Sequence, residues 1–176
     1  MCTGRYTTTY MNRDVIAIAV GCVLAIVAGG WLFLSATSKG PSVAQPEAVP
    51  FAVIDKGYTS GDITSRKNYR IHTPAELQEL WRMVYGVDAP SAPPVDFTED
   101  EVIAVFDGTH SSGGFGISIV EVRDSGLTRV VRIRHSEPGE GCITTQAIAS
   151  PFEIVILPKS NSSIAREDVI ETVCCQ

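Results

Sequence analysis

The chain has 176 residues and a net charge of −6, which is enough for one domain of ordinary size and a short additional segment. Only Arg5, Arg13 and Asp14 are charged among the first 38 residues, so this segment carries +1 and the remainder carries −7. Because Lys and Arg supply most of the affinity for phosphate backbones, an acidic domain without a basic stripe is not expected to bind nucleic acid.

An uncharged apolar segment, residues 15–34, follows a short tail of residues 1–14. At about 1.5 Å per residue this segment would span roughly 30 Å as a helix, the thickness of membrane hydrocarbon. We therefore predict a transmembrane helix over residues 15–35, with Arg5 and Arg13 holding the tail in the cytoplasm. The expected location is the cytoplasmic membrane, crossed once, with the C-terminal domain outside the cytoplasm.

Two alternatives to a retained helix arise from the same segment. A cleaved signal peptide has an apolar core of about 7 to 15 residues before a small-residue site, and residues 36–38 form a weak site of this kind. A lipoprotein anchor at Cys22 would leave twelve apolar residues after the cysteine, which such a protein has no reason to carry. The length of the apolar run favours the retained helix.

Residues 36–50 contain three prolines among small residues, a composition that is typical of an extended linker. We expect this linker to pack against nothing. The folded domain is expected over residues 51–176, and it begins with a strand over residues 51–58 and a second strand over residues 67–72.

A helix is predicted after these strands. Thr73 provides a hydroxyl N-cap, a proline follows it, and Glu76 can close a capping box. Apolar residues then recur along one side of the helix, at Leu77, Leu80, Trp81 and Val84. Gly86 is expected to end the helix, and Trp81 is interpreted as a core residue that packs on the sheet.

Residues 101–157 are the most regular stretch. Residues 101–106 form an apolar run that is too short for a globular helix and suits a strand covered on both faces. Two further strands are expected, one with Phe115, Ile117 and Ile119 on one face and one with Val131, Ile133 and His135 on one face. A hairpin over residues 142–149 and 152–157 and a short strand over residues 168–173 complete the series.

These elements predict an α+β fold. The expected architecture is a mainly antiparallel β-sheet of about six or seven strands, curled into a half-barrel or a sandwich, with one amphipathic helix packed on it.

Several short motifs occur in a fixed order, namely PVDFTEDEVIAVF at 94–106, SGGF at 112–115, GCITTQA at 141–147 and SPF at 150–152. In this order they resemble the C-terminal domain of the PrcB family of protease-complex subunits, from about residue 51 to residue 159. The resemblance implies an extracytoplasmic, membrane-anchored accessory subunit, for which no catalytic residues are established. The chain departs from the family at residues 111–115, where family members commonly have Pro-Thr-Gly-Gly-Tyr, and in its paired terminal cysteines.

The Gly-rich loop after the apolar run is the candidate partner-binding site. The residues that we single out are Gly108, His110, Ser112, Gly113, Gly114 and Phe115. The glycines can supply positive backbone angles, and free amides of the loop could meet the backbone of a partner. A phosphate-binding loop needs Lys and then Ser or Thr after its second glycine. This chain has Phe115 after Gly114, so no nucleotide is expected, and a plain turn remains the alternative.

His110 stands beside Ser111 and Ser112, which suggests a hydrolase in which the histidine activates a neighbouring serine. Adjacent residues of an extended chain point apart, and no Gly-x-Ser-x-Gly elbow is present, so His110 is interpreted as a surface residue. The hydrolase alternative predicts a pocket that holds His110, a hydroxyl and a carboxylate within hydrogen-bond reach. His72 and His135 lack metal-ligand spacing, so no metal or other cofactor is expected.

Cys142 can pair with Cys174 or Cys175 if the domain lies in an oxidising compartment. Such a disulfide closes a loop of about 32 residues and would add about 3 to 4 kcal/mol in the chain-entropy model. A bond between the neighbours Cys174 and Cys175 is strained and is the less favoured alternative.

The function that we expect from the sequence is a membrane-anchored, non-catalytic binding module. Its expected partner is another protein of the cell envelope, with an envelope or secreted protease as the first candidate. The hydrolase is one alternative, and a structural envelope domain without a dedicated partner is another.

Overall fold

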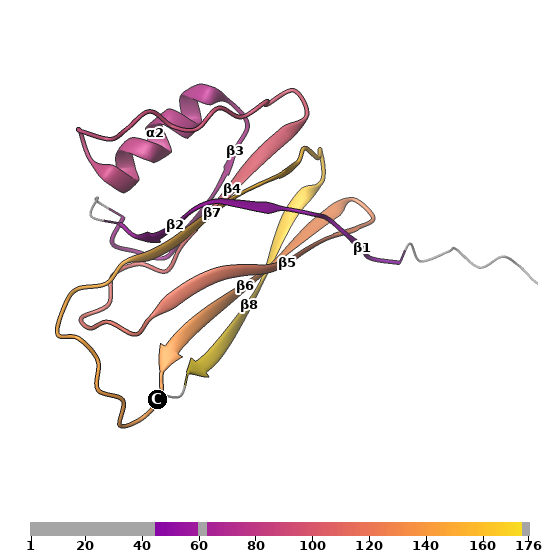
Figure 1. Cartoon of the computed structure of the whole chain (residues 1–176). Helices are drawn as coiled ribbons and strands as arrows, with labels where there is room; N and C mark the ends of the chain where they lie inside the picture. Colours follow the sequence, from indigo (N-terminus) through magenta and orange to yellow (C-terminus); the bar gives the residue numbers. More distant parts are fainter. Residues whose placement is uncertain (1–44, 60–62, 174–176) are drawn as a thin grey trace, which may run out of the picture. The chain divides into compact units, whose positions relative to one another are not determined.

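The computed structural model describes residues 45–59 and 63–173, which form two β-sheets and one helix (Figure 1). The transmembrane helix that was predicted over residues 15–35 lies outside this part of the chain. Among the described residues, none of the helices has the length and apolarity needed to cross a membrane. The α+β class is confirmed for the described domain, which is mainly antiparallel.

The described strands form two four-stranded sheets. The central sheet has the order β2 (Ala52–Tyr58), β7 (Pro151–Pro158), β4 (Asp100–Phe106) and β3 (Lys67–Ile71). The outer sheet has the order β1 (Glu47–Ala48), β5 (Gly116–Ser125), β6 (Thr128–Pro138) and β8 (Ser163–Val173). Neighbouring strands are antiparallel except for β6 and β8, which run parallel. The sandwich alternative is therefore correct, whereas a parallel pair was not expected.

The helix α2 (Pro74–Tyr85) forms as the sequence predicts. The Thr73 hydroxyl accepts a hydrogen bond from the Glu76 amide, and the Glu76 carboxylate accepts one from the Thr73 amide, which completes the capping box. Gly86 ends the helix with a φ of 83°, a value that glycine adopts without strain. The buried residues are those of the expected stripe: Leu77, Leu80, Trp81 and Val84. Trp81 is therefore a core residue.

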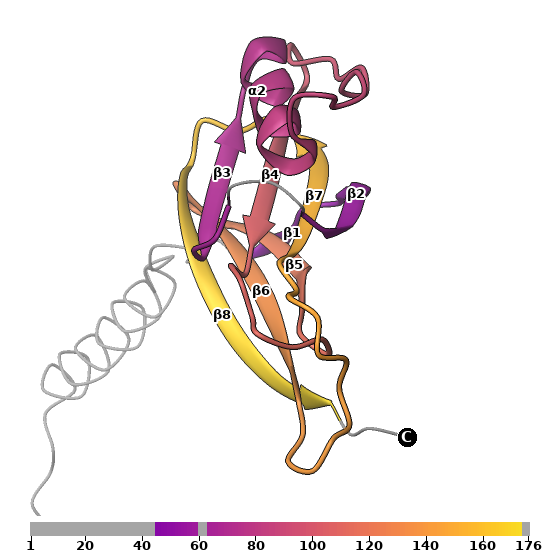
Figure 2. The same ribbon diagram turned by 90° about the vertical axis from the view of Figure 1, so that its left-hand side faces the viewer.

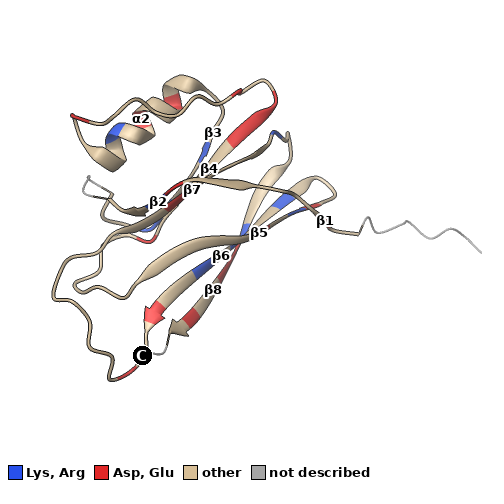
Figure 3. Ribbon diagram, in the orientation of Figure 1, with Lys and Arg blue, Asp and Glu red and all other residues tan. Residues whose placement is uncertain are grey.

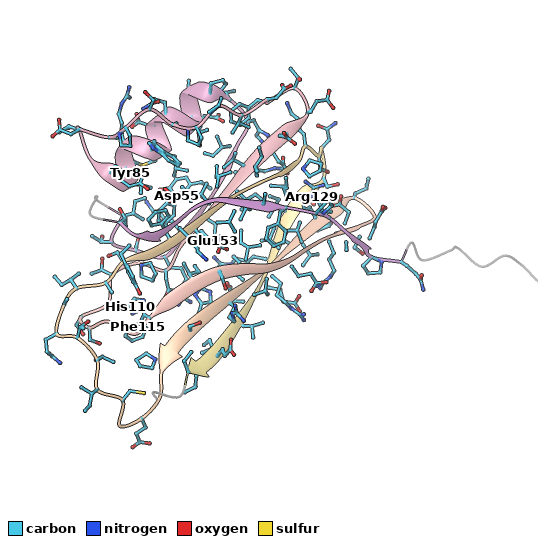
Figure 4. All side chains as sticks on the ribbon, in the orientation of Figure 1. Asp55, Tyr85, His110, Phe115, Arg129 and Glu153 are labelled. Atoms are coloured by element: carbon cyan, nitrogen blue, oxygen red, sulfur yellow. The ribbon has the colours of Figure 1, made fainter. Side chains whose placement is uncertain are left out.

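Tyr85 fixes the last turn of α2 to the central sheet. Its hydroxyl donates a hydrogen bond to the carboxylate of Asp55 on β2, and Figure 4 shows the two side chains meeting between the helix and the strand. Partial burial, followed by the bond to Asp55, raises the pKa of Tyr85 to about 12. Tyr85 therefore remains a neutral donor across the usual pH range.

The central sheet is covered on both faces, which explains the unbroken apolar run of β4. Val102, Ala104 and Phe106 point toward α2 and belong to one core cluster. Ile103 and Val105 point toward the outer sheet and belong to a second core cluster. Since burying a Val, Ile or Phe side chain contributes about 1.5 to 3 kcal/mol, both layers stabilise the strand.

The linker prediction is wrong at its C-terminal end. Glu47 and Ala48 form β1, which pairs with Asp124 and Arg123 at the edge of β5. The Val49 amide then donates to the Val122 carbonyl at 2.8 Å. Val49 also packs against the core between the sheets. Because residues 47–49 bond to the backbone of β5 and Val49 packs in the core, this end of the linker is fixed to the outer sheet.

The hairpin prediction is also wrong for its first strand. The segment 139–150 is a long loop between β6 and β7, and its only ladder contact among the described residues is an isolated bridge between Ala149 and His110. The loop has strand-like composition, but no neighbouring strand pairs with it. The last strand, β8, begins at Ser163 rather than at the expected residue 168.

Candidate functional site

Two loops meet at one end of the sandwich. Residues 108–115 connect β4 to β5, and residues 139–150 connect β6 to β7; both are visible at the lower left of Figure 1. The His110 amide donates to the Ala149 carbonyl at 2.8 Å, and the Ala149 amide donates to the His110 carbonyl at 3.1 Å. The Gly113 amide donates to the Thr145 carbonyl at 2.9 Å. We call this pair of joined loops the double loop.

The glycines of the double loop have distinct roles. Gly108 has a φ of 82°, and a Cβ placed on it would lie 2.9 Å from the Arg66 amide nitrogen. Gly114 also has a positive φ, of 90°. Gly113 has no positive φ, but a Cβ there would collide with the Thr145 hydroxyl. The predicted need for positive angles is therefore confirmed at Gly108 and Gly114, while Gly113 allows the two loops to approach.

His110 is not the surface residue that the sequence suggested. Its Nε2 atom lies 2.8 Å from the Oδ2 atom of Asp107, and its ring stacks on Phe115 with centroids 3.9 Å apart and planes 6° apart. Figure 4 shows the two rings side by side at the loop end. Asp107 directly follows β4 and is buried, so it draws the histidine inward.

Asp107 is the centre of a polar network that connects four segments. Its Oδ1 atom lies 2.7 Å from Nδ1 of His135 on β6 and 2.8 Å from a guanidinium nitrogen of Arg66. The Nε2 atom of His135 lies 3.0 Å from Oδ1 of Asp168 on β8. His135 is buried. Because a buried carboxylate needs several donors to offset its desolvation, this network holds the base of residues 108–115 in place.

Sequence reasoning missed Asp107 and Asp168. A signal for them existed, because His135 lies on the inward face of β6 beside Val131 and Ile133, and a buried imidazole requires partners. The sequence does not say which residues those partners are, since Asp107 and Asp168 come from distant strands.

Among the described residues, the network does not form a complete catalytic or metal site. His110 has a carboxylate partner in Asp107, but no hydroxyl is hydrogen-bonded to His110 among the described residues, and Thr109 and Ser150 bond to each other at 3.0 Å. A cavity of about 270 Å³ lies between the edges of β3 and β8 and is not lined by His110. Within residues 45–59 and 63–173, no three His, Cys, Asp or Glu side chains are arranged for a metal. Among the described residues, His110 therefore has a carboxylate partner and no hydrogen-bonded hydroxyl.

The surface of the double loop is nearly uncharged and exposes two large apolar side chains. Ile143 is 99% exposed and Ile148 is 78% exposed. The Tyr58 hydroxyl donates a hydrogen bond to the Phe115 carbonyl. Glu140 is the only Asp, Glu, Lys or Arg in residues 108–115 and 139–150. In Figure 3 the loops are correspondingly tan, whereas red and blue segments occur along β6 and β8. Exposed apolar side chains in a neutral setting are typical of protein contact sites.

The disulfide hypothesis stays a prediction, because Cys174 and Cys175 lie outside the described residues. The Sγ atom of Cys142 lies 3.8 Å from the carbonyl oxygen of Val173, the residue just before Cys174. The Gly139 amide donates to the same oxygen at 3.0 Å. The end of β8 is therefore adjacent to the loop that carries Cys142.

Comparison with protein families gives one match. Residues 102–158 match the family model described as PrcB C-terminal. The match confirms the resemblance over this range and does not extend to residues 51–101. The matched range begins in β4 and ends with β7, and it contains the whole double loop. Comparisons with curated proteins and with solved structures give no match.

Proposed function

Since residues 102–158 match the PrcB C-terminal family, we propose that this chain is a non-catalytic accessory subunit of a protease complex. In this proposal the double loop docks on another protein, and an envelope or secreted protease is the first candidate. Residues 15–34 anchor the chain in the cytoplasmic membrane, with the described domain outside the cytoplasm.

The observation that carries the proposal is the construction of the double loop. Ile143 and Ile148 are held in solvent by a loop that is itself bonded to residues 108–115. Exposing these side chains on a fixed loop offers the apolar anchors from which protein interfaces are built. The buried polar network centred on Asp107 supports the double loop. A preformed surface loses less conformational entropy on binding than a flexible one.

A structural envelope domain without a partner would not need this surface. Such a domain would tolerate charge at Ile143 and Ile148, whereas a docking surface would not, because a desolvated, unpaired charge weakens an interface. The two readings therefore differ in the effect of surface substitutions that leave folding intact.

The test uses Ile143→Asp/Ile148→Asp in the full-length chain. Its matched control is Leu127→Asp, because Leu127 is also exposed, at 88%, but lies in the β5–β6 turn. Each chain is crosslinked in intact membranes of the source cell, captured, and its partners are identified by mass spectrometry. We expect a protease-containing complex with the unsubstituted chain and with Leu127→Asp, and its loss with Ile143→Asp/Ile148→Asp.

Thermal unfolding of the three purified chains provides the folding control. A complex that survives the double substitution with equal yield would contradict docking through the double loop. A purified chain that turns over a peptide or ester substrate alone, and loses this turnover in His110→Gln, would contradict the non-catalytic assignment.

A further inference from the structure

Among the described residues, the outer sheet has one long edge with which no further strand pairs. β8 is the last strand of this sheet, it has 11 residues, and its pairing with β6 shows no register shift. The other three edges of the described sheets are limited, since β1 has two residues, β3 has five and begins at Lys67, and β2 has an irregularity between Val53 and Asp55. Soluble proteins protect exposed edges with short strands, lysine, proline, bulges or inward-pointing charges. Of these β8 has only the inward-pointing charges of Arg166 and Asp168, which have opposite signs and contact each other.

Apolar side chains lie along this edge of β8, whose outer backbone groups have no strand partner in the described part of the chain. Ile170 is 62% exposed, and Ile164, Val169 and Val173 are exposed to lesser degrees. Figure 2 shows β8 running along the side of the domain, with β6 as its neighbour in the sheet. An edge of this length with unpaired backbone groups and apolar side chains can accept an additional strand.

The sequence of β8 indicates which strand fits. Residues 164–170 read Ile-Ala-Arg-Glu-Asp-Val-Ile and are symmetric about Glu167 in polarity, with opposite charges on either side of it. If two copies pair antiparallel with Glu167 opposite Glu167, the facing pairs are Ile164 with Ile170, Ala165 with Val169, and Arg166 with Asp168. Apolar and opposite-charge cross-strand pairs of this kind stabilise an antiparallel ladder.

We propose that β8 is a dimerisation strand, through which two copies of this chain join their outer sheets antiparallel with Glu167 at the twofold axis. The proposal concerns a different surface from the double loop and does not depend on the proposed function. It would place two double loops in one assembly.

The central pair of glutamates is compensated by arginines on the same face. The carboxylate of Glu167 lies 2.9 Å from a guanidinium nitrogen of Arg123 and 3.4 Å from Nε of Arg132. The hydrogen bond from Arg123 is the main cause of a lowered pKa of Glu167, so both glutamates are charged at neutral pH. Two glutamates at the axis would therefore share four guanidinium groups.

Neighbouring registers lack this complementarity. A shift that centres the pairing on Asp168 would set Arg166 opposite Ile170 and Glu167 opposite Val169. A shift that centres it on Arg166 would set Ile164 opposite Asp168. Both shifts place charges against apolar side chains, and a shift by a single residue would exchange the two faces of the sheet.

The inward pair, Arg166 and Asp168, is available for the second copy. The two side chains contact each other within one chain at 3.3 Å, and Arg166 is more than half exposed. Asp168 also accepts from His135 at 3.0 Å. Each Asp168 would thus gain a guanidinium from the facing chain without losing its own partners.

The first test measures mass and register on the full-length chain in detergent. Sedimentation equilibrium should give a dimer, after the detergent contribution is subtracted. Glu167→Cys should then join two copies with a thiol crosslinker shorter than about 10 Å, because directly opposite Cβ atoms lie about 4.5 to 5.5 Å apart. Glu171→Cys, on the same face, would lie roughly 27 Å from its counterpart and should stay at the background of the unsubstituted chain.

The second test breaks the pairing by charge. Arg166→Asp places an aspartate of each copy opposite Asp168 of the other copy, so both facing pairs carry like charges. We therefore expect the dimer dissociation constant to rise about tenfold or more. Arg82→Asp, at an exposed position on α2 away from β8, should leave it unchanged. A monomer at all concentrations, or a dimer in which Glu167→Cys crosslinks no better than Glu171→Cys, would overturn the proposal.

Discussion

The layer between the two sheets has a polar cluster at each end, and the two clusters are built differently. At one end Arg129, whose side chain is 3% exposed, donates to both oxygens of Asp124, to Glu101 and to the Pro158 carbonyl. At the other end, below the double loop, the central group is the Asp107 carboxylate, and two of its partners are His110 and His135. Figure 4 labels Arg129 and His110 at the two ends.

The difference also appears in the carboxylates of the two ends. The hydrogen bonds from Arg129 lower the pKa of Asp124, so this end holds charges that are matched. Glu153, on β7 toward the double loop, is buried, and its carboxylate accepts a hydrogen bond from the Ile119 amide at 2.6 Å. Desolvation raises the pKa of Glu153. We infer that the Arg129 end mainly stabilises the fold, whereas the other end holds a functional surface at some cost in stability.

The largest expected effect is the loss of the guanidinium at the Arg129 end. Arg129→Met would leave Asp124 without its main donor and Glu101 buried with fewer donors, and removing one partner of a buried ion pair costs about 3 to 5 kcal/mol. Arg132→Met on the outward face of the same strand should cost about 1 kcal/mol or less, because its pairs are exposed. Urea unfolding measures both, and equal losses would contradict the assigned role of Arg129.

The second prediction concerns the hypothetical disulfide of Cys142. We expect Cys142→Ser to lower the free energy of unfolding by about 3 to 4 kcal/mol without reductant, and to have a much smaller effect when reductant is present. Peptide mapping under non-reducing conditions should connect Cys142 to Cys174 or Cys175. Cys142 that alkylates freely in protein from the cell envelope would end the disulfide hypothesis.

The third prediction concerns the buried network below the loops. Asp107→Asn keeps the side-chain shape but removes the charge that faces Arg66, His110 and His135, so we expect a loss of about 1 to 3 kcal/mol. Hydrogen exchange at the His110 and Ala149 amides should become faster as well. Asp88→Asn, at an exposed position after α2, is the control and should change neither quantity. Unchanged exchange in Asp107→Asn would mean that Asp107 does not hold the loop.

The smallest effect is a contrast in pH dependence. Glu153 has a folded-state pKa above its usual 4.5, so it lowers stability as the pH rises above 4.5. Relative to Glu153→Gln, the unsubstituted chain should therefore lose stability over that range, by less than about 2 kcal/mol. Asp124 has a folded-state pKa below 3.8, so its contribution is present above pH 3.8 and is lost as the pH falls through the folded-state value. Urea unfolding across pH measures the free energy of unfolding of the unsubstituted chain minus that of each variant. As the pH rises, this difference should fall for Glu153→Gln and rise for Asp124→Asn. Changes of the same sign would contradict the contrast.

Elements that depend on neighbours in the sequence could be predicted. The helix has its capping box and its apolar stripe within 14 residues, and the run from Val102 to Phe106 already indicates a strand with two covered faces. The inward face of β6 followed from alternation, since Val131, Ile133 and His135 all point inward as expected.

Features that depend on distant partners could not be predicted. The partners of Arg129 and His135 come from β4, β5 and β8, and alternation along one strand does not identify them. β8 is exposed on both faces, so its first half shows no apolar period. In the candidate site, the glycines and the loop position were predictable, whereas the inward rotation of His110 toward Asp107 was not.

The central claim is that the double loop contacts a partner and the opposite end does not. The most direct measurement places a photocrosslinking amino acid at Ile148 or at Leu127 of the full-length chain and irradiates intact source cells. The account predicts a discrete crosslinked product with a protease or its complex from Ile148 and none from Leu127. No product from Ile148, or the same product from both positions, would contradict it.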